Sequence, residues 1–436
     1  MPIGSRLTTL LVVLALVALP AVALRAFCVG KSCDSGEATA SAAVPFCPLP
    51  AELRGLISAG FRQGRSPDVM AATDANGPGV RVDDGPGIAV PWPSTGRADT
   101  RVPIAFFGTG FTGRDPAEGT GLDQIAPTLA AAMGYDRSHD EVRAGVPADG
   151  VADASHEPSL VVQVVWKGVG SADLEAHPHA WPFLRATIAG GGGTLEGTTG
   201  SLPLDPTATL TTIGTGGLPA QHGITGTIIR GDDGDVAPAW GPGAPGSVIA
   251  TLADDLDRDT DQRALIAGVL SSRSDRGIIG DGWYVDRRDR DTVVVTRHPL
   301  PAVAGLLDQV GPEGGVIGVV VRGDVGAMDR TTRQIVRSVR AQVPSAAFVV
   351  TSTGSLRGAR GEDAAAIAQR VDASLGSQVI EASAADGLFI DRTVAAQASI
   401  TAAGVSDALE AEHTPAGAPL FAGTFPSFAV AFARYC

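Results

Sequence analysis

The residues of this chain that could do chemistry are concentrated between positions 159 and 226. Lys167 follows an apolar run at 160–166 that does not alternate, and a Thr-rich segment at 207–215 is followed by Gly216, with His222 six residues further on. A threonine hydroxyl can serve as a nucleophile, and a lysine ammonium can hold an anion. Because ligands of open α/β sheets bind beyond the carboxyl ends of the strands, we expect any site to lie around Lys167 and these hydroxyls.

Each of these residues also has a structural interpretation. A buried lysine at the end of a strand needs a carboxylate or a bound anion as its partner, and both remain open for Lys167. Threonines such as Thr207 are common at the cap and first turn of a helix. His222 precedes a glycine and is interpreted as ordering a turn. His177 and His179 have a spacing that could suggest a metal site, but no carboxylate motif accompanies them, so exposed polar residues are favoured.

Composition bounds the class of protein. The chain has 436 residues, of which 44% are hydrophobic and 18% charged, and this is enough to bury one large core or two modest ones. Its net charge of −14 argues against nucleic acid and against an anionic membrane surface as partners.

The N-terminus carries an uncharged, mostly apolar run at 7–24, flanked by Arg6 and Arg25. Its short core, its proline and its small-residue triplet fit a signal peptide within residues 1–27. The run is also just long enough to span a bilayer, so an uncleaved membrane anchor is the alternative. Either interpretation predicts an extracytoplasmic protein, secreted or attached to the membrane through this segment.

Four cysteines lie at the two ends of the chain, at positions 28, 33, 47 and 436. An even count in an exported chain favours structural disulfides over one metal site. Cys436 is too far along the sequence to pair with the others unless the two ends of the domain meet. Residues 28–48 are interpreted as a cysteine-containing linker, and residues 49–436 as a single domain.

Apolar strand patterns alternate with helical patterns along that domain, which predicts the α/β class with a mainly parallel sheet. The expected strands are 66–72, 102–107, 160–166, 277–279, 292–296, 316–321 and 346–352. The expected helices are 49–64, 123–133, 179–188, 248–256, 260–271, 301–310, 327–342, 362–375 and 405–411.

Several motifs together resemble the alkaline phosphatase superfamily, and most closely its type I phosphodiesterase/nucleotide pyrophosphatase-like branch. They are TIGTGGLPAQHGI at 212–224, SSRSDRGIIG at 271–280, MDRTTRQIVRSV at 328–339 and AAFVVTS at 346–352. GRSPDV at 64–69 and the segment at 100–134 resemble parts that such enzymes carry near their C-terminus. The resemblance therefore implies a three-layer αβα fold that is circularly permuted, with 49–150 equivalent to the family's C-terminal part and 158–436 to the rest.

The permutation also bears on the cysteines, because the new chain ends would fall at one break point of the ancestral chain. It implies a disulfide between Cys47 and Cys436. Cys28 and Cys33 would then form a local one.

Enzymes of this family hold two divalent metals with Asp and His and attack phosphorus with Thr or Ser. In this sequence Lys167 stands where the resemblance places the first Asp ligand, and Pro206 where it places the nucleophile, with Thr207 one residue away. Residues 353–355 (TGS) replace the Asp-His-Gly motif. Asp324 is a weak remnant of another ligand motif, in which Ala327 replaces the His. The resemblance therefore implies an emptied metal centre, with no metal and no cofactor.

The substrate-holding positions are only partly kept. Thr227 occupies the place of an Asn, and Ser274 that of a Lys, while Asp275 and Arg276 remain. Lys167, Thr227 and Arg276 are the candidate anion-binding residues, although an arginine that follows an aspartate is more often a structural ion pair.

The resulting hypothesis is an exported, catalytically degenerate alkaline phosphatase-like protein, a pseudoenzyme that binds an anion or an envelope protein, or that serves as a structural component of the cell envelope. The alternative is an atypical, metal-independent phosphoesterase that uses Thr207, with Lys167 and Arg276 as fixed cations. A well-formed pocket at Lys167 would favour ligand binding, and a site filled by side chains would favour a structural role.

Overall fold

The structure is a computed structural model that describes residues 44–83, 88–96, 99–135, 144–281, 283–284, 291–356 and 359–436. Pro45–Cys436 forms one compact unit. The predicted export segment, Cys28 and Cys33 lie outside the described residues, as does most of the predicted linker at 28–48.

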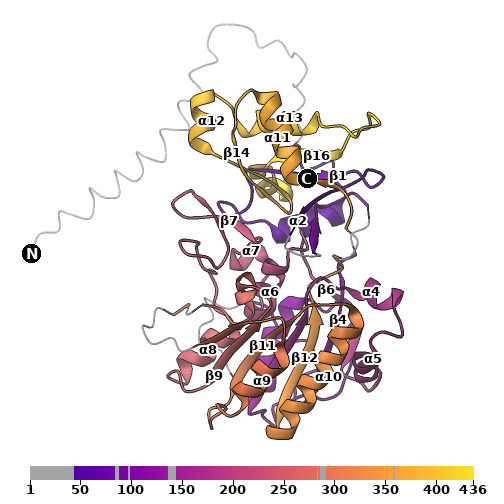
Figure 1. Cartoon of the computed structure of the whole chain (residues 1–436), viewed down its shortest axis with the longest axis vertical. Coiled ribbons are helices and arrows are strands. Elements are labelled where there is room, and N and C mark those ends of the chain that lie inside the picture. Colours follow the sequence, from indigo (N-terminus) through magenta and orange to yellow (C-terminus); the bar gives the residue numbers. More distant parts are fainter. Residues whose placement is uncertain are drawn as a thin grey trace, which may run out of the picture. The chain divides into compact units, whose positions relative to one another are not determined.

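A seven-stranded sheet is the largest element of this unit (Figure 1), with the strand order β10-β9-β11-β5-β12-β4-β6. Its parallel strands are β5 (Leu160–Trp166), β9 (Leu265–Leu270), β10 (Thr292–Val295), β11 (Gly315–Val321) and β12 (Ala346–Ser352). At one edge, β4 (Arg101–Gly108) runs antiparallel to β12, and β6 (Gly193–Thr198) antiparallel to β4. The predicted α/β class with a mainly parallel sheet is confirmed at this level.

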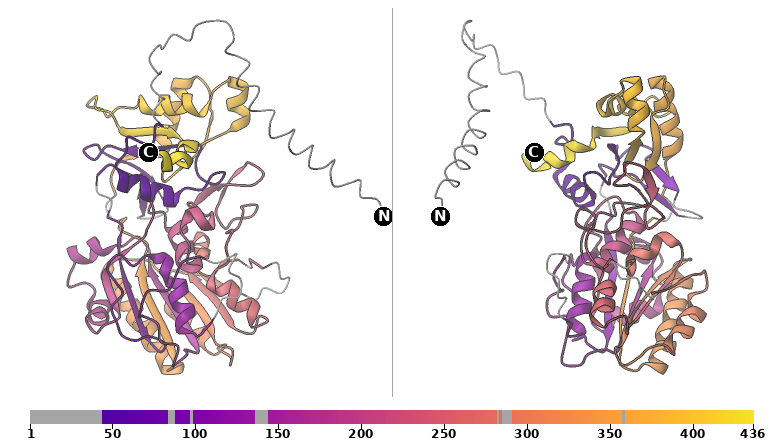
Figure 2. Two further views of the ribbon diagram at one scale, coloured as in Figure 1. Left: turned by 180° about the vertical axis from the view of Figure 1, so that it is seen from behind. Right: turned by 90° about the vertical axis from the view of Figure 1, so that its left-hand side faces the viewer.

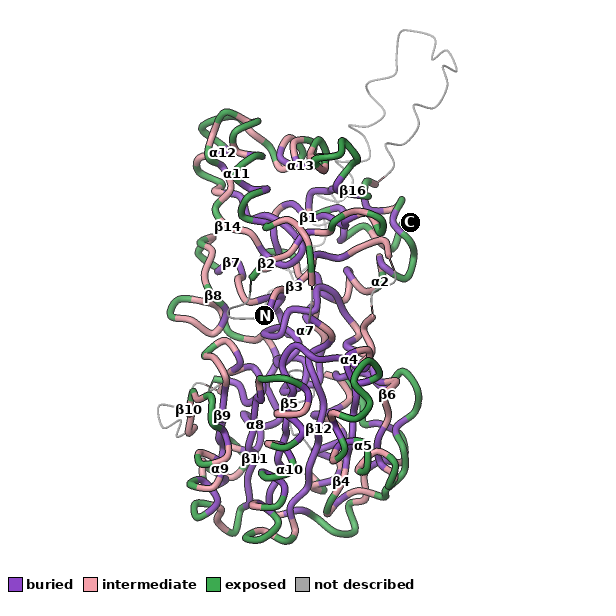
Figure 3. The backbone as a smooth tube through the Cα atoms, turned by 45° about the vertical axis from the view of Figure 1, so that its right-hand side comes forward, coloured by how far each residue is buried: buried purple, intermediate pink, exposed green. Residues whose placement is uncertain are grey.

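The strand β5 is apolar except for Gln163, because both of its faces are covered. Val162 and Val164 pack into one hydrophobic cluster with residues of three helices: α5 (Pro182–Ala189), α9 (Pro299–Leu307) and α10 (Val325–Gln342). Val161 and Val165 pack into another cluster with residues of α3 (Ile125–Ala132), α6 (Pro206–Thr215) and α8 (Leu252–Asp259). Alternate residues of a strand face opposite sides, so the sheet is the middle of three layers. Figure 3 shows its strands as the most continuously buried part of the backbone.

A smaller sheet joins segments from the two ends of the described chain. Its order is β14-β15-β1-β16, and each adjacent pair is antiparallel. The strand β1 (Val69–Thr73) lies between β15 (Gly387–Ile390) and β16 (Phe421–Pro426), and β14 (Ile380–Ala384) forms one edge. Residues of α11 (Ala364–Leu375), α12 (Arg392–Ala398) and α13 (Ala402–Glu410) pack with this sheet in one apolar cluster.

Short elements complete the described fold. Two minor sheets consist of β2 (Val80–Asp83), β3 (Ala89–Pro91) and β13 (Glu362–Asp363), and of β7 (Ile228–Arg230) and β8 (Val236–Pro238). The remaining helices are α2 (Ala51–Gly60), α4 (Ser171–Ala176), α7 (Pro219–His222), η1 (Leu122–Gln124), η3 (Arg273–Ile278) and η4 (Ser427–Tyr435).

Most predicted elements are present, but two are wrong. The predicted helix at 260–271 is replaced by a turn and the buried strand β9, because Asp261 and Gln262 take positive φ angles of 53° and 58° and end the helical run. The predicted strand at 277–279 is instead the end of the 3₁₀ helix η3 and the residue after it. The predicted strand at 102–107 lies inside the main sheet as β4.

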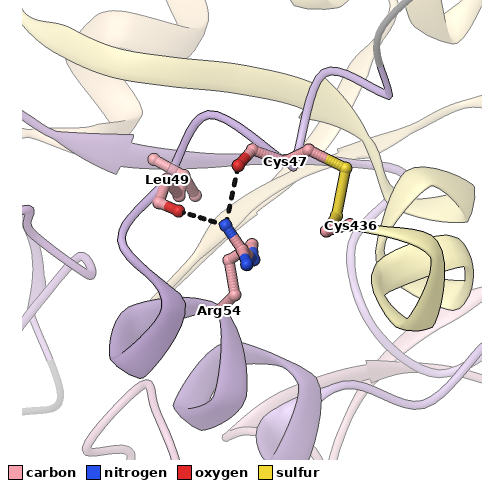
Figure 4. The surroundings of a disulfide bond; sticks show 4 residues. All are labelled: Cys47, Leu49, Arg54 and Cys436. Carbon is pink, nitrogen blue, oxygen red and sulfur yellow. Dashed lines mark hydrogen bonds between the residues drawn. A yellow bond between two sulfur atoms is a disulfide. The ribbon is translucent and has the colours of Figure 1, made fainter.

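A disulfide closes the described chain, as the permutation implied. Cys47 and Cys436 are bonded, with their Cα atoms 5.2 Å apart (Figure 4). Arg54 donates from one guanidinium nitrogen to the carbonyl oxygens of Cys47 and Leu49, at 2.7 and 2.6 Å. Beside the bridge, η4 packs against α2 (Figure 2). The two ends of the unit therefore meet.

Within the described residues, no helix combines the length and the apolar character that crossing a bilayer would require. Any membrane attachment through the segment at 7–24 remains a prediction.

Removing the disulfide should lower the free energy of unfolding. The bridge joins cysteines 389 positions apart, so it restricts the unfolded chain strongly, and the double substitution Cys47→Ser/Cys436→Ser should cost about 2–5 kcal/mol. Urea unfolding measures this effect. The reduced wild-type protein should match the reduced variant, and equal stability of the oxidised wild type and the variant would contradict the prediction.

Candidate functional site

The carboxyl ends of the parallel strands meet at one edge of the large sheet, where Lys167 follows β5, Ser271 follows β9 and Thr353 follows β12. The backbone continues the strand pairing at this edge, since the N–H of Lys167 donates to the carbonyl of Val321 and that of Thr353 to the carbonyl of Trp166. This is the edge at which open α/β sheets bind ligands. The fold thus places Lys167 where sequence reasoning expected a site.

Lys167 forms a buried ion pair with Asp275. Its Nζ lies 2.9 Å from Oδ1 of Asp275, and the two side chains are 1% and 0% exposed. The other carboxylate oxygen of Asp275 accepts hydrogen bonds from the N–H and hydroxyl of Ser271, at 2.9 and 2.6 Å, and from the N–H of Ser272 at 2.8 Å. Of the two partners left open for Lys167, the structure provides a carboxylate. A cation and an anion thus neutralise each other at the end of β5.

The helix η3 brings Asp275 to this position, because it packs against α6. A Cβ atom on Gly277 would lie 2.1 Å from the hydroxyl of Thr211, so only glycine allows the two helices to approach this closely. The Thr-rich helix and the ion pair therefore belong to one packed unit.

Thr207 occupies the first turn of α6, whose N-cap is Asp205. The Asp205 carboxylate accepts from the N–H groups of Thr207 and Ala208, at 2.8 and 3.3 Å. It also accepts from the N–H and hydroxyl of Thr227, at 2.8 and 3.2 Å, and the Thr207 and Thr227 hydroxyls lie 3.1 Å apart. The structure thus brings together two of the predicted site residues, Thr207 and Thr227. The Thr207 side chain is fully buried, so its hydroxyl faces other protein groups and not a surface.

His222 orders the turn after α7, as its structural interpretation proposed. Its Nδ1 accepts from the N–H of Ile224 at 3.1 Å, and its Nε2 lies 3.1 Å from the hydroxyl of Thr212. Complete burial lowers the pKa of His222 to about 3. The neutral imidazole therefore interacts with Thr212, one and a half helical turns beyond Thr207.

Arg276 and Asp324, the other two candidates, both serve local structure. Arg276 donates to the carbonyl of Gly280 at 2.9 Å and pairs with Asp281 at 2.6 Å. Asp324 is the N-cap of α10 and accepts from the N–H of Ala327 at 2.7 Å. Ala327, where the resemblance expects a His, thus provides the capped amide.

A residue that the sequence did not single out adds a titratable group near Asp205. Asp386 lies in the turn between β14 and β15 and is 3% exposed. Burial, reinforced by the negative charge of Asp205, raises the pKa of Asp386 to about 7. The sequence around it, AADG, signals only a tight turn, so no local pattern could have revealed its neighbour 181 positions earlier in the chain (386 − 205).

Among the residues described, no group of three or more His, Cys, Asp or Glu side chains is arranged to hold a metal ion. No protein-family model, no curated protein and no solved structure matches the chain.

Breaking the buried ion pair should be costly. Lys167→Met should lower the free energy of unfolding by about 3–5 kcal/mol, because the buried Asp275 side chain would lose its cationic partner. Urea unfolding gives the value. Arg263→Gln is the matched control, since it breaks a more exposed pair between Arg263 and Glu313 and should cost less than about 1 kcal/mol. Equal small losses in both variants would show that Lys167 does not depend on Asp275.

The buried Asp386 predicts a pH-dependent effect. Its raised pKa means that the folded state favours the protonated carboxyl, so stability is fully present below the usual aspartate pKa near 3.8 and is lost as pH rises through about 7. Asp386→Asn should therefore be close to neutral at pH 4 and stabilising by a few kcal/mol at pH 8. Thermal unfolding at both pH values measures the difference. The control Asp407→Asn, at an exposed position, should change the stability equally at the two pH values. If Asp386→Asn is less stable than the wild type at pH 8, the raised pKa of Asp386 is refuted.

Proposed function

We propose that this chain is a catalytically degenerate member of the alkaline phosphatase superfamily, circularly permuted and acting as a binding or structural component of the cell envelope. The observation that carries the proposal is the buried Lys167–Asp275 pair. It fills the carboxyl end of β5, where the resemblance places a carboxylate ligand of the first metal. An ammonium group has no lone pair with which to bind a divalent cation. Asp275 already serves as its counter-ion.

The topology supports the permutation. The segment at 102–107, which resembles a C-terminal part of the family, pairs as β4 with β12. The Cys47–Cys436 bridge joins the two ends of the domain. In a permuted chain these ends would be neighbours at the point where the ancestral chain was opened.

The C-terminal helix supports a role in binding. On η4 the side chains of Phe428, Phe432 and Tyr435 are 57%, 46% and 66% exposed. Aromatic side chains exposed together on one short helix are common at protein interaction surfaces. An extracytoplasmic location is proposed from the apolar segment at 7–24 and agrees with the presence of a disulfide.

The alternative, a phosphoesterase that uses Thr207, has one observation in its favour. Asp386 provides a carboxyl group whose pKa near 7 suits proton transfer, close to the cap of the helix that carries Thr207. Against it, the Thr207 hydroxyl is fully buried and bonded to Thr227, so a substrate could reach it only after α6 and its neighbours moved apart.

Metal content and hydrolysis separate the two functions. After dialysis against trace zinc, elemental mass spectrometry should find far less than one zinc per chain, and bis(p-nitrophenyl) phosphate should be hydrolysed no faster than in buffer. Stoichiometric zinc with hydrolysis would overturn the proposal.

If hydrolysis occurs without metal, substitution of the nucleophile decides the matter. Thr207→Val should then abolish the activity. Thr209→Val, which removes a neighbouring hydroxyl bonded to the carbonyl of Asp205, should leave it intact.

A further inference from the structure

A pocket of about 370 Å³ opens beyond the carboxyl ends of three neighbouring parallel strands, β9, β10 and β11. Its wall consists of residues within two positions of the ends of these strands and of the first residue of α9: Ser271, Thr296, Arg297, Pro299, Val320, Arg322 and Gly323. It shares Ser271 with the surroundings of the buried ion pair but has neither Lys167 nor Thr207 in its wall. The position is that of ligand sites in open α/β sheets.

Two arginines give the pocket a positive charge in a chain whose net charge is −14. The side chain of Arg297 is exposed, and within the described part of the chain no hydrogen bond or ion pair ties down its guanidinium. Arg322 is half-buried at the end of β11. The exposed guanidinium of Arg297 therefore places a positive charge at a pocket of a protein whose net charge is negative.

The polar groups of the wall suit an anion as well. The Thr296 hydroxyl oxygen accepts from the N–H of His298 at 3.0 Å, which leaves its proton to donate. The helix α9 begins at Pro299 in the wall, and its N-cap, His298, makes no side-chain capping bond. The positive end of this helix dipole adds to the charge of the arginines. Pro299 and Val320 provide an apolar surface beside these groups.

We propose that this pocket binds the carboxylate or phosphate group of a small organic anion, with Arg297 and Arg322 as its cationic partners. Guanidinium groups bind both kinds of oxyanion through paired hydrogen bonds. The volume is near the lower end of small-molecule sites, about 300–1,000 Å³. The pocket needs no metal and does not involve Thr207, so the inference holds whether or not the chain hydrolyses phosphate esters.

Isothermal titration calorimetry on the purified full chain tests the site, with sodium succinate and inorganic phosphate as separate probes at an ionic strength fixed with chloride. We expect saturable binding of at least one probe. Arg297→Gln and Arg322→Gln should each weaken it by ~10-fold or more, because each removes a charge-assisted hydrogen bond. Binding of succinate alone would identify a carboxylate site, and binding of phosphate alone a phosphate site.

Arg263→Gln is the matched control, because it removes the same charge near the amino ends of the same strands, where Arg263 pairs with Glu313. Its affinity should equal that of the wild type. The proposal fails if neither probe binds at millimolar concentration, or if the control loses as much affinity as the pocket variants. Circular dichroism verifies folding, and the exposed Arg297 keeps the test decisive if the Arg322 variant does not fold.

Discussion

Parallel pairing of apolar strands is the constraint on which the rest of this structure depends. Strands such as β5 and β11 are buried on both faces, so helices must cover both sides of the sheet, and every connection between parallel strands must cross over. The same pairing brings the carboxyl ends of the strands to one edge. Any charged group at that edge then lies at the end of an apolar layer, where it needs either a partner or water.

The two groups of charges at this edge meet that requirement in different ways. Lys167 is enclosed and has an internal carboxylate, which makes it part of the core that joins β5 to η3 and α6. Arg322 follows β11, which is next to β5, and Arg297 follows β10, three strands from β5; both line an open pocket. The edge is thus closed by the protein's own side chains at β5, whereas beyond β10 it exposes the guanidinium of Arg297.

The sequence carried information about the fold wherever a pattern was local. Mostly apolar runs at 160–166, 316–321 and 346–352 predicted strands that the structure contains. The strand β9 escaped prediction because the turn before it uses Asp261 and Gln262 at positive φ without the glycine that normally marks such a turn. The site was less accessible. Sequence reasoning stated that Lys167 needs a partner but could not choose Asp275, 108 positions away, and nothing near Asp386 indicated that it would lie beside Asp205.

The bond between Cys47 and Cys436 also has a mechanical meaning. Together with the backbone it forms a covalent ring that contains all the sheets and helices described between the two cysteines. If the chain were pulled at Cys436 and at the segment that precedes Cys47, the force would pass through the disulfide. The backbone between the two cysteines would not be stretched. The paired strands β1 and β16, which lie near the two ends of this ring in the sequence, would carry none of that force. A domain held by a tether at this point can be pulled without being unfolded, for as long as the bridge remains oxidised.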